Sequence, residues 1–157
     1  MKFSIREANA GDLDALNEIN REVQTIHHRI DRLIFKNSKE ADIRAELKSL
    51  IDDQKCGVLI ASTNDIMLGF ISYRERTLPE SGLTNEIPMI FIHHIGVKSI
   101  YRKQSIGTAL MDAVFKIAHL KNIERVQLDV WTLNLDAKSF FQKRGFRTIS
   151  EIMMRSA

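Results

Sequence analysis

The chain has 157 residues, of which 44% are hydrophobic and 27% charged, and its formal net charge is +3. These values are typical of a soluble globular protein and exclude disordered and collagen-like chains. A chain of this length suits one hydrophobic core, so we expect residues 1–157 to form a single domain. The positive charge is spread along the chain without a basic run, which disfavours a nucleic-acid partner.

The sequence also bears on compartment and metal binding. Its longest apolar runs are much shorter than a membrane span, and residues 1–8 lack the apolar core and cleavage site of a secretory signal. Cys56 is the single cysteine, so neither an internal disulfide nor a thiolate metal cluster can form. We therefore expect a cytoplasmic protein that has no membrane partner and binds no metal.

The first half of the chain predicts one strand followed by two helices. Residues 3–8 alternate apolar and polar side chains, which is the period of a half-buried strand. Residues 9–30 repeat apolar side chains every three or four positions, which indicates an amphipathic helix that Asp12 could cap. Residues 37–53 predict a second helix, in which Asn37 and Glu40 have the spacing of a capping box.

The second half predicts mainly strands. Residues 56–62 and 66–77 have the pattern of a hairpin, and residues 87–97 form a further strand with Pro88 near its start. We then expect a helix from Ser105 to about Leu120, a strand over residues 125–131 and a short helix ended by Gly145. A last strand is expected over residues 147–155.

The segment VKSIYRKQSIGTAL, from Val97 to Leu110, joins a predicted strand to a predicted helix through a basic turn. Unpaired N–H groups and the positive end of the helix dipole make such a junction an anion site, to which Arg102 and Lys103 add charge. Gly107 lets the main chain approach a diphosphate closely. The segment matches neither the dinucleotide nor the P-loop fingerprint. Taken alone, it fits an ordinary helix start equally well.

Two segments together make the chain resemble the GCN5-related N-acetyltransferase (GNAT) superfamily. The first is RKQSIG, Arg102 to Gly107, which follows a strand ending in IGV. The second is NLDAKSFFQKRGF, residues 134–146, which matches the family pattern N-x-x-A-x-x-(F/L)-Y-x-x-x-G-F except at the tyrosine. The resemblance implies an α/β (α+β) fold with a mixed, mostly antiparallel central sheet of about 6–7 strands. About four helices would flank this sheet, and two strands would splay apart at the acetyl-CoA site.

The resemblance also implies that acetyl-CoA is a cosubstrate and indicates which residues would bind it. In the family, amides of the loop hold the pyrophosphate, the preceding strand binds the pantetheine arm, and the asparagine of the second segment approaches that arm from the other side. The residues at these positions are Ile95, Gly96, Val97, Arg102, Lys103, Gln104, Ser105, Ile106, Gly107, Thr108, Asn134 and Phe141. Asn134 serves equally well as a helix N-cap.

The chain departs from the family pattern at two positions. Ser105 replaces a glycine, which we expect to be tolerated because a residue at a helix N-terminus has an ordinary negative φ. Phe141 replaces a tyrosine whose hydroxyl is often assigned to protonate the leaving thiolate. Phenylalanine cannot donate a proton, so water, Tyr73 or Tyr101 would have to serve.

An amine acceptor must lose a proton before it can attack a thioester, because a lysine-like amine has a pKa of about 10.4. In the family the base comes from the strand that enters the loop, which here ends in FIHHIGV. His93 is therefore the first candidate base, followed by His94 and Glu86, and a purely structural role is the alternative for each. Strict alternation places His93 on the face of Ile95 and Val97, unless a bulge interrupts the strand.

These expectations combine into one predicted activity and one alternative. The predicted activity is direct transfer of an acetyl group from acetyl-CoA to a primary amine of a small molecule or peptide, an acyltransferase reaction of EC 2.3.1 type. The backbone N–H of Val97 would then stabilise the oxyanion. The alternative is a non-catalytic coenzyme A-binding or partner-binding module with the same fold, which Phe141 would permit. A homodimer is compatible with either.

Overall fold

The computed structural model describes residues 2–64 and 66–155. Eleven elements follow one another in this part of the chain: β1 (Ser4–Glu7), η1 (Ala10–Asp12), α1 (Leu13–Ile30), α2 (Glu40–Asp52), β2 (Cys56–Thr63), β3 (Ile66–Leu78), β4 (Ile87–Val97), η2 (Ser99–Tyr101), α3 (Ile106–Leu120), β5 (Arg125–Leu128) and α4 (Leu135–Lys143). None of the helices in these residues is both long enough and apolar enough to cross a membrane.

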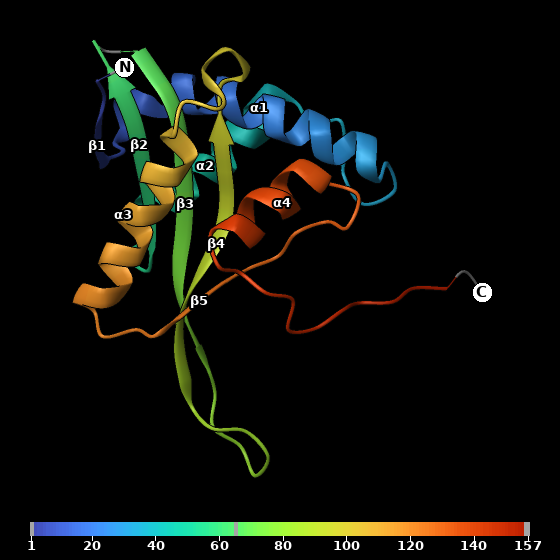
Figure 1. Cartoon of the computed structure of the whole chain (residues 1–157). Coiled ribbons are helices and arrows are strands. Elements are labelled where there is room, and N and C mark those ends of the chain that lie inside the picture. Colours follow the sequence, from blue (N-terminus) through green and yellow to red (C-terminus); the bar gives the residue numbers. More distant parts are fainter. Residues whose placement is uncertain (1, 65, 156–157) are drawn as a thin grey trace.

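The described strands form one sheet in the order β1-β2-β3-β4-β5 (Figure 1). Neighbouring strands are antiparallel except β4 and β5, which are parallel. This arrangement confirms the mixed, mostly antiparallel sheet. It contains five strands within the described residues, so the expected number of about 6–7 was too high.

The helices cover both faces of the sheet, with α1 and α2 on one side and α3 and α4 on the other (Figure 1). Alternating residues of the strands supply the two cores, as the pleat of a sheet requires. On β2, Val58 and Ile60 pack with Leu16 of α1 and Leu47 of α2, whereas Leu59 belongs to the opposite core. That opposite core also contains Ile71 and Ile90 of the sheet, Leu110 and Val114 of α3, and Phe141 of α4.

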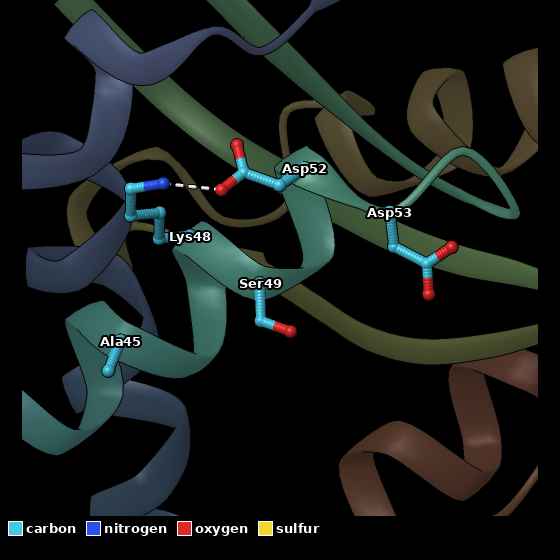
Figure 2. A pocket seen from close by; sticks show the side chains of 5 residues that line it. All are labelled: Ala45, Lys48, Ser49, Asp52 and Asp53. Atoms are coloured by element: carbon cyan, nitrogen blue, oxygen red, sulfur yellow. Dashed lines mark hydrogen bonds and ion pairs between the residues drawn. The ribbon is translucent and has the colours of Figure 1, made fainter.

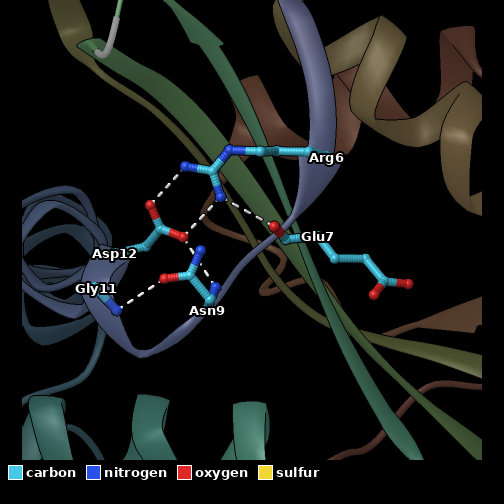
Figure 3. Close-up of polar contacts among 5 residues, drawn as sticks. All are labelled: Arg6, Glu7, Asn9, Gly11 and Asp12. Carbon is cyan, nitrogen blue, oxygen red and sulfur yellow. Dashed lines mark hydrogen bonds and ion pairs between the residues drawn. The ribbon is translucent and has the colours of Figure 1, made fainter.

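The predicted caps of the first two helices need correction. Asn9 and Asp12 form a reciprocal capping box around η1, and Asp12 also receives two hydrogen bonds of 2.8 Å from Arg6 of β1 (Figure 3). The Asp12 side chain therefore does not cap α1 itself. The second helix begins at Glu40, and neither Asn37 nor Lys39 caps it with a side chain.

The end of the sheet also differs from the sequence prediction. β5 ends at Leu128, three residues earlier than expected, and residues 147–155 form no strand. Every residue from 147 to 155 is exposed. The alternating pattern in that segment indicates a preference for extended backbone, but a strand also needs a paired neighbour, and within residues 2–64 and 66–155 the segment pairs with no strand.

Candidate functional site

The sheet opens between β4 and β5. The two strands pair only from Met89 to Ile92 on β4, and β4 then continues to Val97 without β5 beside it. Lys98 donates its N–H to Leu68 of β3 at 2.9 Å, and Val97 lies opposite Gly69. In an antiparallel ladder this makes Val97 a non-hydrogen-bonded position, whose N–H and C=O point away from β3. The amides of Val97 and, two residues earlier, Ile95 therefore point into the opening.

A β-bulge at His93 changes which residues share a face of β4. Ser72 lies opposite His94, whereas Tyr73 lies opposite Ile92, so His93 has no residue directly across from it. Ile92 packs in the α3-side core, as do Ile95 and Val97 after the bulge. The ring of His93 lies 5.2 Å from that of Phe91, which is on the α1/α2 face. The prediction that His93 shares a face with Ile95 and Val97 was therefore wrong, because a bulge adds one residue to the count.

His93 and His94 are adjacent imidazoles under α1 and α2, with ring centroids 6.4 Å apart. Burial lowers the pKa of His93 to about 4, and the nearby positive charge of Arg76 contributes to this shift. Burial also lowers the pKa of His94 to about 4, and His27 of α1 adds to the effect. Nε2 of His93 and Nδ1 of His94 are buried without a hydrogen-bond partner. Both rings are therefore neutral at neutral pH, and each has a buried nitrogen without a hydrogen-bond partner.

Aromatic rings connect the end of α1 to the loop after β5. The ring of Phe35 lies 4.8 Å from that of His27 and 5.0 Å, edge-on, from that of Trp131. Nδ1 of His28 is 2.7 Å from the carbonyl oxygen of Phe35, which fixes the loop between α1 and α2. The sequence pattern did not identify Phe35, because DRLIFK has neither helix nor strand period. Its one available signal was an aromatic residue within a polar loop.

The turn from β4 to α3 holds two non-glycine residues in the left-handed region. Lys103 and Ser105 both have φ of 62°. The expectation of a negative φ at Ser105 was thus wrong, and its side chain makes no capping hydrogen bond. Left-handed backbone costs about 1–2 kcal/mol for an ordinary residue and clusters at functional sites. Alternation of backbone handedness along a turn directs successive N–H groups into one concavity that suits an anion.

The first amides of α3 complete this concavity. Ala109 is the first residue of the helix whose N–H reaches an intrahelical carbonyl, that of Ser105, at 3.0 Å. The amides of Ile106, Gly107 and Thr108 precede that bond and have no carbonyl partner within the helix. A Cβ built at Gly107 would lie 3.4 Å from the Phe140 ring and 3.8 Å from Val97, which is ordinary contact. Packing therefore does not require glycine at position 107.

Arg102 does not extend freely from the turn. Its Nε donates to the carbonyl oxygen of Val97 at 3.1 Å, and its Nη2 lies 3.3 Å from a carboxylate oxygen of Glu22. The same oxygen of Glu22 accepts from the N–H of Ser99 at 3.3 Å, and Lys98 pairs with Glu18 at 2.9 Å. These contacts fasten the turn to α1, while Lys103 and Gln104 remain exposed.

The second predicted motif lies on α4. Asn134 caps this helix by accepting from the N–H of Ala137 at 3.3 Å. Phe141 is 7% exposed and packs against Phe140 and Phe146. It therefore belongs to the α3-side core, next to the residues that approach Gly107.

Neither tyrosine is an evident replacement for the missing hydroxyl. A Cβ at Gly57 would clash with the Tyr73 ring and hydroxyl, so this side chain extends over β2 and away from the β4–β5 opening. Tyr101 ends η2 and packs at the edge of the α3-side core.

Glu86 stands apart from the other candidates. It is exposed in the loop before β4, at the end of the hairpin that extends beyond the rest of the sheet (Figure 1). Seven residues of extended chain separate it from His93, which corresponds to roughly 23 Å along the strand. The structure therefore does not bring Glu86 together with the histidines.

A surface depression on α2 is unrelated to these residues. It is lined by Ala45, Lys48, Ser49, Asp52 and Asp53, and its lysine is paired with Asp52 (Figure 2). Its helical residues lie on the exposed side of α2, opposite the buried Ile43, Leu47 and Leu50. Within residues 2–64 and 66–155, no three acidic, histidine or cysteine side chains are grouped so that they could hold a metal ion.

Comparisons with known proteins agree with this architecture. The family model described as "Acetyltransferase (GNAT) family" matches residues 19–146. No curated protein sequence matches the chain at a significant level. A solved structure of a mutant BH1408 protein from Bacillus halodurans has a TM-score of 0.93 at 19% identity, over 98% of this chain and 99% of that one.

Two further solved structures contain ligands. AAC(6')-Iy in complex with the bisubstrate analogue CoA-S-monomethyl-acetylneamine has a TM-score of 0.78 at 16% identity, over 100% of this chain and 99% of that one. A predicted acetyltransferase with acetyl-CoA from Clostridium acetobutylicum has a TM-score of 0.74 at 18% identity, over 99% and 96% of the two chains. At these identities the likeness shows the fold alone.

The described sheet is mixed and opens between β4 and β5, and the family model covers most of the chain. This protein belongs to the GNAT acetyltransferase family, whose members use acetyl-CoA.

Proposed function

We propose that this protein transfers the acetyl group of acetyl-CoA directly to a primary amine of a small molecule or peptide. The observation that carries the proposal is the continuous run of available backbone amides from the β4–β5 opening to the start of α3. Ile95 and Val97 direct N–H groups into the opening, and Ile106, Gly107 and Thr108 supply the uncapped amides of α3. The first set suits an amide-containing arm and an oxyanion, and the second suits a diphosphate.

Acetyl-CoA, when bound, would supply an acetyl thioester, which is an activated acyl group. The residues that would hold it are the amides of Ile95 and Val97, the turn from Arg102 to Ser105, and the amides of residues 106–108. The left-handed backbone at Lys103 and Ser105 supports this assignment, because such strain persists where a ligand site requires it. Asn134 already caps α4, so its contribution to coenzyme binding is secondary.

The chemistry requires one proton to be removed and one to be supplied. The amine nitrogen bonds to the thioester carbonyl carbon, whose oxygen becomes an oxyanion stabilised by the Val97 N–H. The C–S bond then breaks, giving the amide and a thiolate. We assign Nε2 of His93 as the acceptor of the proton from nitrogen, because this atom is buried, unpartnered and neutral at neutral pH. Water protonates the thiolate, since Phe141 cannot.

The groups around His93 also bear on the acceptor. Arg76 and Arg74 both lower the pKa of this ring, and Glu46 alone raises it. Arg74 is paired with Asp53 at 2.9 Å, whereas Arg76 lies over the Phe91 ring at 3.9 Å. A polycationic acceptor would be repelled by this field. The aromatic contacts of Phe35 and Trp131 favour an amine with an apolar or aromatic neighbour.

The deciding experiment is an amine panel monitored by release of free thiol from acetyl-CoA. We expect turnover with monoamines and N-terminal amines that carry aromatic groups, and slower turnover with polyamines and aminoglycosides. A control without acceptor measures hydrolysis. Faster turnover of polycations would contradict the acceptor class while leaving the transferase activity intact.

A specific observation favours one alternative, a coenzyme A-binding module without catalysis. Phe141 is buried where a proton donor would be expected from the resemblance, and neither tyrosine replaces it. If coenzyme A raises the melting temperature but no amine releases thiol, this alternative is correct. If neither coenzyme A nor acetyl-CoA raises the melting temperature, both functions are wrong.

A further inference from the structure

The turn that follows β4 lies beside α1 (Figure 1), and two acidic side chains of that helix reach it. Glu18 pairs with Lys98 at 2.9 Å. Glu22, one helical turn later, accepts from the N–H of Ser99 and from Nη2 of Arg102, both at 3.3 Å and both on the same oxygen. Both ion pairs are partly exposed to solvent, where such pairs contribute little to stability. The contacts of Glu22 are therefore better explained by the groups that they hold in place.

Arg102 connects Glu22 to the end of β4. Its Nε donates to the carbonyl oxygen of Val97 at 3.1 Å. That carbonyl belongs to the same peptide group as the N–H of Lys98, which donates to the carbonyl oxygen of Leu68 on β3 at 2.9 Å. Because a peptide group is planar, this one is held from both sides, by β3 through its N–H and by the guanidinium through its oxygen.

The restraint matters because the N–H of Val97 points into the β4–β5 opening, where the proposed function assigns it to the oxyanion. Among the described residues, β5 pairs with β4 only as far as Ile92. The hydrogen bonds of a neighbouring strand therefore do not hold the outer side of Val97. The contact from Arg102 takes their place and limits the backbone rotation that aims this N–H.

Glu22 determines which group Arg102 contacts. A guanidinium has five N–H donors and binds phosphate readily through two parallel hydrogen bonds. Arg102 lies in the turn proposed to hold a diphosphate, so a free guanidinium would turn toward that ligand and leave Val97. A carboxylate on Nη2 instead keeps Nε on the carbonyl oxygen. The second hydrogen bond of Glu22, from the N–H of Ser99, fixes the start of η2 at the same time.

We propose that Glu22 is a positioning residue for acetyl transfer, which holds Arg102 on the Val97 carbonyl and so aims the Val97 amide at the oxyanion. The catalytic part of this inference rests on the proposed function, whereas the restraint on Arg102 does not. The coenzyme diphosphate is assigned to the amides at the start of α3, which Glu22 does not contact. Loss of Glu22 should therefore affect the chemical step more than coenzyme binding.

The first test measures steady-state thiol release from acetyl-CoA. A small misplacement of a catalytic group lowers the rate strongly, so we expect Glu22→Ala to lower kcat about 10-fold with little change in the KM for acetyl-CoA. Glu22→Gln should recover most of kcat, because its amide oxygen can accept the same two hydrogen bonds. Glu18→Ala is the matched control, since it removes an ion pair to the same turn without touching Arg102, and it should keep full activity. An unchanged kcat in Glu22→Ala, an equal loss in Glu18→Ala, or a rise in KM alone would overturn the proposal.

The second test needs neither coenzyme nor acceptor. An arginine Nε–H that donates a hydrogen bond exchanges slowly with water and gives a distinct peak in a 15N-correlated NMR spectrum of the full chain. The variant Arg102→Lys identifies the peak of Arg102 by its loss. We expect slow exchange of this proton in the unmodified protein and in Glu18→Ala, and about 10-fold faster exchange in Glu22→Ala.

The two tests separate the restraint from the activity. Equal exchange in all three proteins would overturn the proposal even if the protein is an active transferase. Absence of thiol release from the unmodified protein would refute the proposed function and the catalytic role of Glu22 with it. The exchange measurement would then still decide whether Glu22 holds Arg102.

Discussion

Ser72 of β3 lies directly opposite His94 of β4. The neighbouring pair is Tyr73 opposite Ile92, so regular pairing would have placed His93, not His94, opposite Ser72. This offset is the bulge that leaves His93 unpaired and turns both imidazoles toward α1 and α2. It places two half-buried titratable rings side by side, and Nε2 of His93 and Nδ1 of His94 are buried without hydrogen-bond partners. The stability of the protein should therefore respond to pH in the range where histidine titrates.

The first prediction is that acidification destabilises the fold between about pH 6.5 and 4. In the unfolded chain a histidine has a pKa of about 6.5, whereas the folded protein lowers the pKa of His93 and His94 to about 4. Within this window the unfolded state binds more protons, so the free energy of unfolding falls as the pH falls. Allowing for partial solvent screening, we expect a loss of about 1 kcal/mol for each ring between pH 7.5 and 5.

Urea unfolding at the two pH values measures this loss. The groups that face the rings are Arg74, Arg76, Glu46 and His27, and none of them is changed in the test. The double variant His93→Gln, His94→Gln should lose much less stability between pH 7.5 and 5. His119→Gln, an exposed histidine on α3, should behave like the unmodified protein. An equal pH slope in all three proteins would show that the rings of His93 and His94 are not responsible.

The second prediction concerns catalysis by His93. His93→Gln should lower kcat by about 100-fold, the lower end of the range for loss of a general base. Because its pKa of about 4 keeps the ring neutral, His93 should remain competent down to about pH 5. The acidic limb of kcat/KM should therefore reflect deprotonation of the acceptor amine and should persist in the variant. Steady-state thiol release from pH 5 to 9 measures both effects.

Two controls accompany this measurement. Glu86→Gln should retain full activity, since Glu86 lies in the loop at the far end of the hairpin. His94→Gln separates the two imidazoles: if it lowers kcat more than His93→Gln does, the base is His94 and the assignment to His93 is wrong.

The third prediction concerns strain at Ser105. Its φ of 62° costs about 1 kcal/mol, and its hydroxyl makes no compensating cap. Ser105→Gly should therefore raise the free energy of unfolding by about 1 kcal/mol and change coenzyme A affinity by no more than a few-fold. Lys103→Gly should stabilise similarly. Gln104→Gly is the control, because Gln104 has no positive φ. Glycine there relieves no strain and only raises the entropy of the unfolded chain, so this variant should not be stabilised. Destabilisation by Ser105→Gly would mean that the left-handed backbone is not a source of strain.

Sequence reasoning identified the elements that depend on local pattern. The helical spacing of α1, the hairpin of β2 and β3, and the Gly145 stop after α4 are all present. The motif residues from Ile95 to Thr108 lie along one continuous path because they are close in sequence. The local sequence pattern was sufficient to predict the structure wherever residues close in sequence determine the backbone conformation.

The errors arose where distant contacts decide the structure. The bulge at His93 depends on how β3 pairs with β4, and no periodicity within β4 encodes it. The last predicted strand has the right residues but pairs with no other strand among the residues that the structure describes. Phe35 meets Trp131 only because two loops distant in sequence converge. Ser105 was judged by the usual φ of a helix start, whereas the turn before α3 imposes a left-handed backbone.

The fourth prediction separates folding from coenzyme binding at Gly107. A methyl group there would make only ordinary contacts with Phe140 and Val97, and alanine is the better helix former. Gly107→Ala should therefore keep or slightly raise the melting temperature. Its amide belongs to the uncapped first turn of α3, where a side chain would restrict the approach of a diphosphate. Coenzyme A affinity should consequently fall about tenfold, a change of about 1.4 kcal/mol.

Isothermal titration calorimetry with coenzyme A and with pantetheine, which carries no phosphate, tests whether the loss of affinity comes from the diphosphate. The affinity for pantetheine should be unchanged in Gly107→Ala, because that ligand lacks the diphosphate. Gly82→Ala is the matched control: Gly82 lies in the open loop before β4 with nothing within 4 Å of an added Cβ, so neither affinity should change. Equal loss of affinity for both ligands would mean that Gly107 acts on the opening between β4 and β5 as a whole. Unchanged coenzyme A affinity in Gly107→Val as well would remove the start of α3 from the binding site.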